Sequence, residues 1–108
     1  MDEQEFRRRA DAALEDLHRR LAVACESHAF DADFNSGTLV VEFEDTNTKF
    51  VVSPNTPVRQ VWVSAQMKSY KLDWDATREA FVLPESRQTL AELVGAAITS
   101  EIHESVTL

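Results

Sequence analysis

The sequence predicts an α+β fold, a two-layer sandwich in which two helices pack on one face of an antiparallel sheet of five or six strands. Three observations predict it: a long apolar stripe at helical spacing near the start, a central run of segments with alternating apolar residues, and a capped apolar stripe near the end. With 108 residues, of which 44% are hydrophobic, the chain has the size and apolar content of a single domain, residues 1–108, around one core.

The first helix is predicted over residues 3–28. Its apolar side chains recur at steps of three and four and therefore line one face: Phe6, Ala10, Ala13, Leu14, Leu17, Leu21 and either Ala24 or Cys25. Asp2 or Glu3 places a negative charge at the positive end of the helix dipole. Asp11 and Glu15 fall on the flanks, away from the stripe.

After a polar break, "DADFNSG" (31–37), the apolar period changes from that of a helix to two residues. Strands are predicted at residues 38–45, 49–53, 58–65, 69–74 and 80–83. Turn residues separate them, including "DTN" (45–47) and the proline-containing "SPNTP" (53–57). Because successive strands joined by short turns pair with their neighbours, we expect one antiparallel sheet whose second face is open to solvent.

The second helix begins at a capping box. In Thr89-Leu-Ala-Glu92 the threonine hydroxyl and the glutamate carboxylate satisfy amides that the first helical turn leaves free. The buried stripe of this helix comprises Leu90, Leu93, Val94, Ala97 and Ile98. The last residues, 103–108, have no period of their own, and two outcomes stay open: Val106 and Leu108 tuck against the helices, or the tail frays.

Trp62 lies on the more polar face of its predicted strand. The more apolar face comprises Arg59, Val61, Val63 and Ala65. Trp62 lies on the other face, between Gln60 and Ser64. A tryptophan buries a large area on binding and has few rotatable bonds to fix, so an exposed one suits a protein-contact site. The alternative is that the tail or a neighbouring strand covers it.

Composition excludes several classes of function. The net charge is −8, and residues 1–45 carry most of it, with 12 acidic against 5 basic residues. Such a field repels nucleic acid and anionic membranes and attracts cations or basic protein surfaces. The single Cys25 forms no internal disulfide, the three histidines lack a metal-motif spacing, and two glycines are too few for a phosphate loop. Without a long apolar run or a secretory signal, the chain is expected to be cytoplasmic.

The stretch "NTPVRQVWVS" (55–64), followed by "YKLDW" (70–74), is typical of a known family. With "DADFNSGTLVVEFED" (31–45) before it, and with "EFRRRADAALEDL" (5–17) and "TLAELVGAAI" (89–98) as the two helices, the chain resembles the frataxin family, and its bacterial CyaY-type members most closely. The likeness covers almost the whole chain, and the Gln-x-Trp stretch is its most specific part.

The resemblance implies a function. Frataxin-family proteins lack an organic cofactor, act in iron–sulfur cluster assembly, bind a cysteine desulfurase and its scaffold protein, and hold iron weakly along an acidic ridge. We therefore expect an iron-binding regulator or iron donor that is not an enzyme and has no catalytic residue. It is expected to bind Fe²⁺ or Fe³⁺ weakly and to act as a bacterial, cytoplasmic monomer, with iron-dependent oligomers left open.

The resemblance also implies site residues. The metal-binding positions are Glu3, Asp11, Asp31 and Asp33, with Glu15 and Asp16 close by. The partner-binding positions are Asn55, Gln60 and Trp62, together with Glu42 and Glu44, which with Asp45 also extend the negative field.

Departures from the family pattern leave two alternative functions open. Where bacterial relatives carry a dense acidic cluster, "LAVACES" (21–27) has Glu26 alone, and Arg7 to Arg9 partly neutralise the ridge. Lys68-Ser69 stands where the family has Gly-Gly and adds a cation near the partner face. One alternative is a ferroxidase-like iron chaperone or storage enzyme, which needs several converging carboxylates. Another is a generic α+β interaction module whose acidic residues are a solvated surface.

Overall fold

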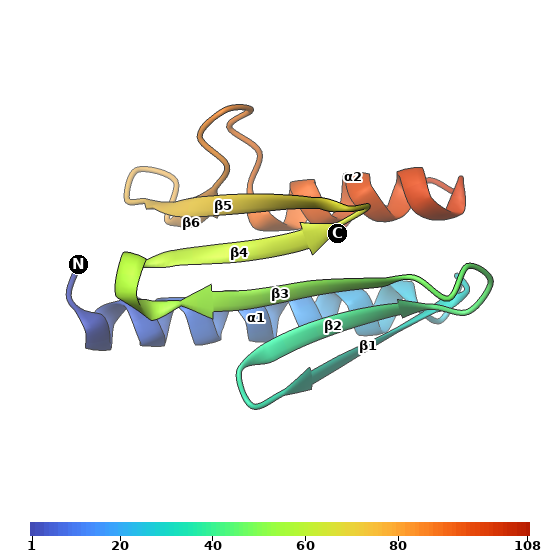
Figure 1. Cartoon of the computed structure of the whole chain (residues 1–108), viewed down its shortest axis with the longest axis horizontal. Coiled ribbons are helices and arrows are strands. Elements are labelled where there is room, and N and C mark those ends of the chain that lie inside the picture. The colour runs from blue at the N-terminus through green and yellow to red at the C-terminus, as the bar shows by residue number, and fades with distance from the viewer.

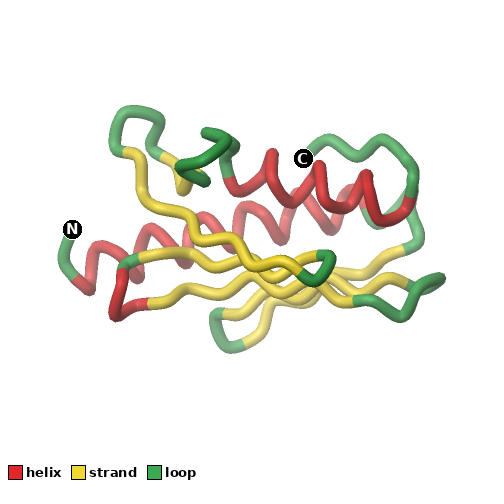
Figure 2. Tube along the Cα trace, turned by 45° about the horizontal axis from the view of Figure 1, so that its top comes forward, coloured by secondary structure: helices red, strands yellow, loops and turns green.

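The computed structural model describes all 108 residues. Its elements, in chain order, are α1 (Glu3–Ala24), β1 (Phe30–Asn35), β2 (Thr38–Phe43), β3 (Lys49–Asn55), a 3₁₀ turn η1 (Thr56–Val58), β4 (Gln60–Ala65), β5 (Lys68–Asp75), β6 (Ala80–Val82) and α2 (Leu90–Ile102). The strands form one antiparallel sheet in chain order, β1 to β6 (Figure 1). Both helices lie on the same side of it (Figure 2), so the predicted two-layer α+β sandwich is confirmed.

Helix α1 forms over its predicted apolar stripe. Asp2 is its N-cap and accepts a hydrogen bond from the Glu5 amide at 2.7 Å. The buried members of the stripe are Phe6, Ala10, Leu14, Leu17 and Leu21. The helix ends at Ala24, four residues before the predicted end at residue 28. The stripe has no further core residue there, and His28 leaves the helix to stack on Phe30 with ring centroids 6.2 Å apart.

Residues 31–35 of the predicted polar break belong to strand β1, so the prediction of a break was wrong there, and only Ser36 and Gly37 form a turn. In β1, Phe30, Ala32 and Phe34 turn toward the helices, while Asp31 and Asp33 face solvent. The alternation was present in the sequence, but the aspartates have low β propensity and concealed it. Pairing with β2 along the whole strand supplies the stability that propensity does not.

The five predicted strands are all present, with ends within two residues of the predicted bounds. The largest local difference precedes β4. Pro57 lies in η1 rather than closing a turn directly onto the strand, and Arg59 takes a left-handed conformation with φ of 55°. Arg59 was therefore wrongly predicted as a core-facing strand residue, because a proline has no N–H to offer a sheet ladder and the strand begins only at Gln60.

The tail after α2 docks rather than frays. The capping box at the start of α2 is formed, with Thr89 and Glu92 exchanging hydrogen bonds of 3.2 and 2.9 Å. Beyond the helix, Val106 is buried, and its amide donates to the Thr99 hydroxyl at 3.0 Å. Neither helix combines the length and the apolar character that crossing a membrane requires.

Candidate functional site

Trp62 projects from the centre of the open sheet face. It belongs to β4, whose alternate residues Val61 and Val63 are buried under the helices. The register places Trp62 opposite Ser53 of β3 and Lys71 of β5. With 37% of its surface exposed, it is covered neither by the tail nor by a neighbouring strand.

A network of neighbouring side chains holds the indole in place. Trp62 Nε1 donates a hydrogen bond to Gln60 Oε1 at 3.0 Å, and Gln60 Nε2 donates to Asp73 Oδ1, also at 3.0 Å. The ammonium group of Lys71 lies 5.0 Å from the centroid of the indole ring, within cation–π distance. The polar edge of Trp62 is thus satisfied within the protein, and its orientation is set before any partner arrives.

Two of these residues, Lys71 and Asp73, were not among the predicted site residues. Their role depends on register, because Gln60 meets Asp73 and Trp62 meets Lys71 only when β4 and β5 pair as they do. Alternation assigns a side chain to a face and does not reveal which residue of the next strand it meets. No signal in the sequence of β5 alone marks them.

Asn55 extends the same site toward one end of the sheet. It is the last residue of β3 and lies opposite Gln60, which in turn lies opposite Asp73. The three positions form one row across the sheet, adjacent to Trp62 along β4. Three of the predicted partner-binding residues, Asn55, Gln60 and Trp62, are therefore brought together, whereas Glu42 and Glu44 are not.

The acidic residues of the sheet occupy its other edge. Asp31 of β1 and Glu42 of β2 lie directly opposite one another on the open face, and like charges in such a pair repel. Glu42 in turn lies opposite Lys49 of β3, with no ion pair between them. Asp33 lies two residues along β1 from Asp31. Glu44 lies just beyond the end of β2, in an exposed turn rather than in the strand as predicted.

The acidic residues of α1 form a separate group. Asp11 and Glu15 are exposed one turn apart, whereas Glu3 is two turns earlier and pairs with Arg7 at 3.3 Å. His18 continues the Asp11–Glu15 face and contacts the sheet edge, with Nε2 3.2 Å from the Ala32 carbonyl oxygen. The acidic residues of α1 and those of β1 and β2 thus lie on either side of this contact.

These carboxylates do not converge on one point. No group of three or more His, Cys, Asp or Glu side chains is arranged to hold a metal ion. Asp16 is also engaged elsewhere, because hydrogen bonds from Arg19 and Arg20, at 2.6 and 2.8 Å, hold its pKa below the usual value. The predicted metal-binding residues Glu3, Asp11, Glu15, Asp31 and Asp33 share a negative field rather than one coordination sphere.

The remaining candidate side chains have local partners. Cys25 is half-buried against the core, and its thiol donates to the Ala22 carbonyl oxygen. His28 Nδ1 lies 2.6 Å from a Glu104 carboxylate oxygen, which ties the end of α1 to the C-terminal tail. None of these groups lies in a nucleophile–base arrangement.

Comparison with known proteins gives consistent matches. The family model of the frataxin-like domain matches residues 1–104. The iron-sulfur cluster assembly protein CyaY of Azotobacter vinelandii is 25% identical over 95 residues, 86% of each chain. CyaY of Herminiimonas arsenicoxydans is 29% identical over 87 residues, 74% of this chain and 78% of that protein. The solved frataxin structure from Psychromonas ingrahamii superposes with a TM-score of 0.78 over 99% of this chain and 97% of that one, at 23% identity, and so has the same fold.

Proposed function

This chain belongs to the frataxin-like domain family, and from that membership we propose that it acts in iron–sulfur cluster assembly as a regulator and iron donor. The resemblance predicted from "NTPVRQVWVS" is confirmed by the family match over residues 1–104. The curated relatives are named as assembly proteins rather than as enzymes. Its proposed partners are a cysteine desulfurase and the scaffold protein, and its proposed location is the bacterial cytoplasm.

The observation that carries this proposal is the preset orientation of Trp62. A tryptophan held by Gln60 at its polar edge and by Lys71 over its ring offers a ready apolar anchor. Fixing the side chain beforehand lowers the entropy that binding must remove. We assign Trp62 and its neighbours Asn55 and Gln60 to the contact with the desulfurase–scaffold assembly.

The acidic groups supply the second half of the contact. Electrostatic docking onto a basic surface needs a field rather than a fixed ligand geometry, which suits the dispersed carboxylates. Asp31 and Glu42, together with the exposed Glu44, border the face that carries Trp62. One partner surface with a basic region and an apolar pocket would engage both.

Iron is proposed to bind weakly at these same carboxylates. Asp11 and Glu15, one helical turn apart, and Asp31 and Glu42, opposed across two strands, each offer hard oxygen donors of the kind that Fe²⁺ and Fe³⁺ accept. Each bound cation would neutralise part of the acidic field and thereby weaken docking onto a basic partner. Iron would in this way regulate the contact.

The experiment that tests the proposal measures binding to a purified bacterial cysteine desulfurase, with and without its scaffold protein. Trp62→Ala is expected to weaken binding by about 2 kcal/mol or more, as central aromatic anchors do. Met67→Ala is the matched control, because Met67 is fully exposed at the tip of the β4–β5 turn and belongs to neither group. Binding should also weaken as salt rises. Equal affinities of the wild type and Trp62→Ala would reject the anchor, and an absence of desulfurase binding would reject the function.

Two alternative functions were left open by the sequence, a generic interaction module and a ferroxidase-like enzyme. Family membership removes the generic interaction module unrelated to frataxins. A ferroxidase-like activity requires several converging carboxylates, and no observation favours such a group over the dispersed field. We therefore propose no enzymatic role.

A further inference from the structure

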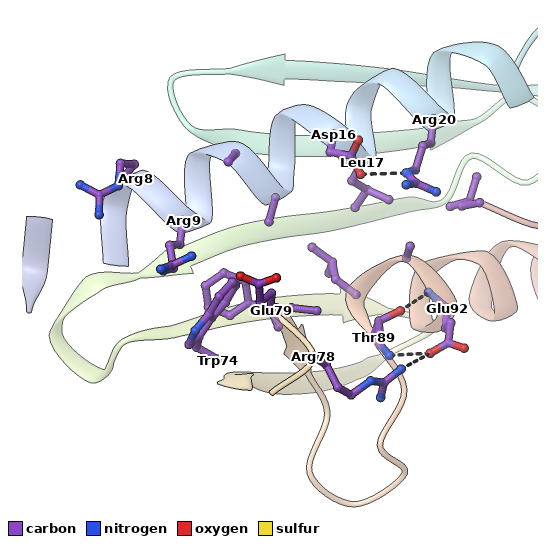
Figure 3. Close-up of a pocket in the computed structure, with 17 residues that line it drawn as sticks. Arg8, Arg9, Asp16, Leu17, Arg20, Trp74, Arg78, Glu79, Thr89 and Glu92 are labelled. Atoms are coloured by element: carbon purple, nitrogen blue, oxygen red, sulfur yellow. Dashed lines mark hydrogen bonds and ion pairs between the residues drawn. The ribbon is translucent and has the colours of Figure 1, made fainter. Parts of the chain in front are cut away.

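We propose that the groove between the two helices is a docking site for a short acidic peptide segment of a partner protein. This interhelical groove, with a volume of about 670 Å³, is bounded by α1 from Arg8 to Arg20, by Trp74 and Arg78, and by the first turn of α2 (Figure 3). It lies on the helical side of the molecule, away from the open sheet face, so its ligand is independent of the proposed desulfurase contact.

The interior of the groove is apolar. Nine of its 17 lining residues are hydrophobic, among them Leu17 of α1, Leu90 of α2 and Leu108 of the tail. Trp74 is half-buried in its wall and meets Phe81 edge-to-face, with ring centroids 5.2 Å apart. The volume and the mixed lining are typical of sites that bind a ligand of several residues or a small molecule.

Arginines surround this apolar interior. Arg8, Arg9, Arg20 and Arg78, four of the eight arginines in the chain, line the groove, although the chain as a whole carries a net charge of −8. Arg8 has no ion-pair partner within the protein. With Asp16, Glu79 and Glu92 also in the lining, the groove carries a net charge of +1 in a molecule whose net charge is −8.

Two of the arginines are held in a position to bind a carboxylate. The Nε of Arg9 pairs with Glu5 at 3.3 Å, and its guanidinium lies 4.6 Å from the centroid of the Trp74 ring. The Nε of Arg20 pairs with Asp16 at 2.8 Å. In both cases the terminal nitrogens form no hydrogen bond within the protein, and these nitrogens form the edge that grips a carboxylate with two parallel bonds.

The three carboxylates that line the groove offset three of its four arginine charges, but two of them have few acceptor positions left for other groups. Both oxygens of Asp16 are engaged, one by Arg19 and one by Arg20. Glu92 accepts from the Thr89 amide and lies 3.6 Å from Arg78, and these interactions lower its pKa. Only Glu79 has no such partner. The groove therefore keeps an excess of one positive charge together with free guanidinium N–H groups on Arg9 and Arg20, and this combination favours an anionic ligand.

The distance between Arg9 and Arg20 favours a peptide over a small carboxylate as the ligand. Arg9 and Arg20 are eleven residues apart on α1, which corresponds to about 16 Å along the helix axis. An extended peptide of about five residues, at about 3.3 Å per residue, spans the same distance. A segment with an acidic residue at each end and apolar residues between them would match both arginines and the apolar interior.

The test uses the fluorescein-labelled peptide acetyl-Asp-Leu-Val-Leu-Asp-amide and the full chain, with fluorescence anisotropy as the measure of affinity. Arg9→Ala with Arg20→Ala is expected to weaken binding by roughly tenfold or more, since charge-assisted hydrogen bonds are lost. The matched control is Arg7→Ala with Lys49→Ala, which removes the same charge from exposed positions that do not line the groove. This control is expected to change affinity by less than about twofold.

Nuclear magnetic resonance of the wild type provides a second measurement that needs no variant. The chain has two tryptophans, so the peptide is expected to shift the indole signal of Trp74 and to leave that of Trp62 unchanged. Any of three results would overturn the proposal: no binding of the peptide, equal weakening by the two double variants, or a shift at Trp62 instead of Trp74. Binding of a long-chain dicarboxylic acid without binding of the peptide would likewise refute a peptide ligand.

Discussion

The indole N–H of Trp62 donates a hydrogen bond to the side-chain oxygen of Gln60, 3.0 Å away and two residues earlier on the same face of β4. Asp73, on the neighbouring strand, accepts the hydrogen bond from the other end of that amide. The carboxylate therefore determines which end of Gln60 faces the indole. Asp73 is thus connected to the predicted anchor through the Gln60 amide.

Asp73→Ala is expected to loosen Trp62 without unfolding the protein. Gln60 loses the acceptor that orients its amide, so the fluorescence anisotropy of the indole should fall and desulfurase affinity should decrease by about 1 kcal/mol, the usual worth of one hydrogen bond. The thermal midpoint should change little, because surface substitutions alter stability by about 0.5 kcal/mol or less. Asp73→Asn keeps an acceptor oxygen and should retain affinity. If both variants bind as the wild type does, Asp73 has no positioning role.

Leu21→Ala is expected to destabilise the fold by about 2–5 kcal/mol, since Leu21 is fully buried beneath α1 and its truncation leaves a cavity. Val23→Ala on the same helix is the control, because Val23 is 65% exposed. Urea unfolding of the two variants measures the difference. Similar midpoints for both would contradict the packing of α1 described above.

The ion pairs of Asp16 are expected to make stability depend on pH. Its folded pKa lies below the ordinary value of 3.8, so the stabilisation is present at neutral pH and is lost as the pH falls through the folded pKa. Because the pairs are solvent-exposed, Asp16→Asn should lower stability at pH 7 by at most about 1 kcal/mol. The difference from the wild type should shrink in acid. Asp11→Asn, on the same helix but without a cationic partner, should show no such dependence, and a gap for Asp16→Asn that persists in acid would refute the assignment.

Neutralising the opposed carboxylates of Asp31 and Glu42 is expected to raise stability in the absence of iron and to reduce the stabilisation by iron. The double variant Asp31→Asn with Glu42→Gln removes a repulsion and should raise stability by about 0.2–1 kcal/mol without metal. Anaerobic Fe²⁺ is expected to raise the thermal midpoint of the wild type, because a ligand stabilises the state that binds it, and the double variant should reduce this rise. Glu85→Gln with Glu101→Gln is the control, since neither residue belongs to the acidic groups. An undiminished iron effect in the first double variant would exclude this pair as an iron site.

The features that the sequence predicted well are those determined by local spacing. The stripe of α1 includes Phe6, Leu14 and Leu21, and the alternation in β4 buries Val61 and Val63. Each follows from the geometry of a helix or a strand, in which neighbours along the chain fix the direction of a side chain. The capping box at the start of α2 is equally local.

Strand β1 shows where local spacing was insufficient. Its aspartates lowered the apparent tendency to form a strand, and only the ladder to β2 and the packing of Phe30 and Phe34 under the helices overcome it. The end of α1 and the start of β4 were misplaced for a related reason. His28 lies outside the helix, where it stacks on Phe30 and contacts Glu104. Arg59 directly follows the 3₁₀ turn that contains Pro57 and therefore precedes the strand.

The sequence by itself determined the apolar stripes of the two helices, which face of the sheet carries Trp62, and the overall acidic charge. Only the tertiary structure decided which residues meet: Gln60 with Asp73, Asp31 with Glu42, and Arg9 with Trp74. The physical reason is that helical and strand periodicity are properties of consecutive residues. Strand register and helix placement instead depend on how distant segments pack together.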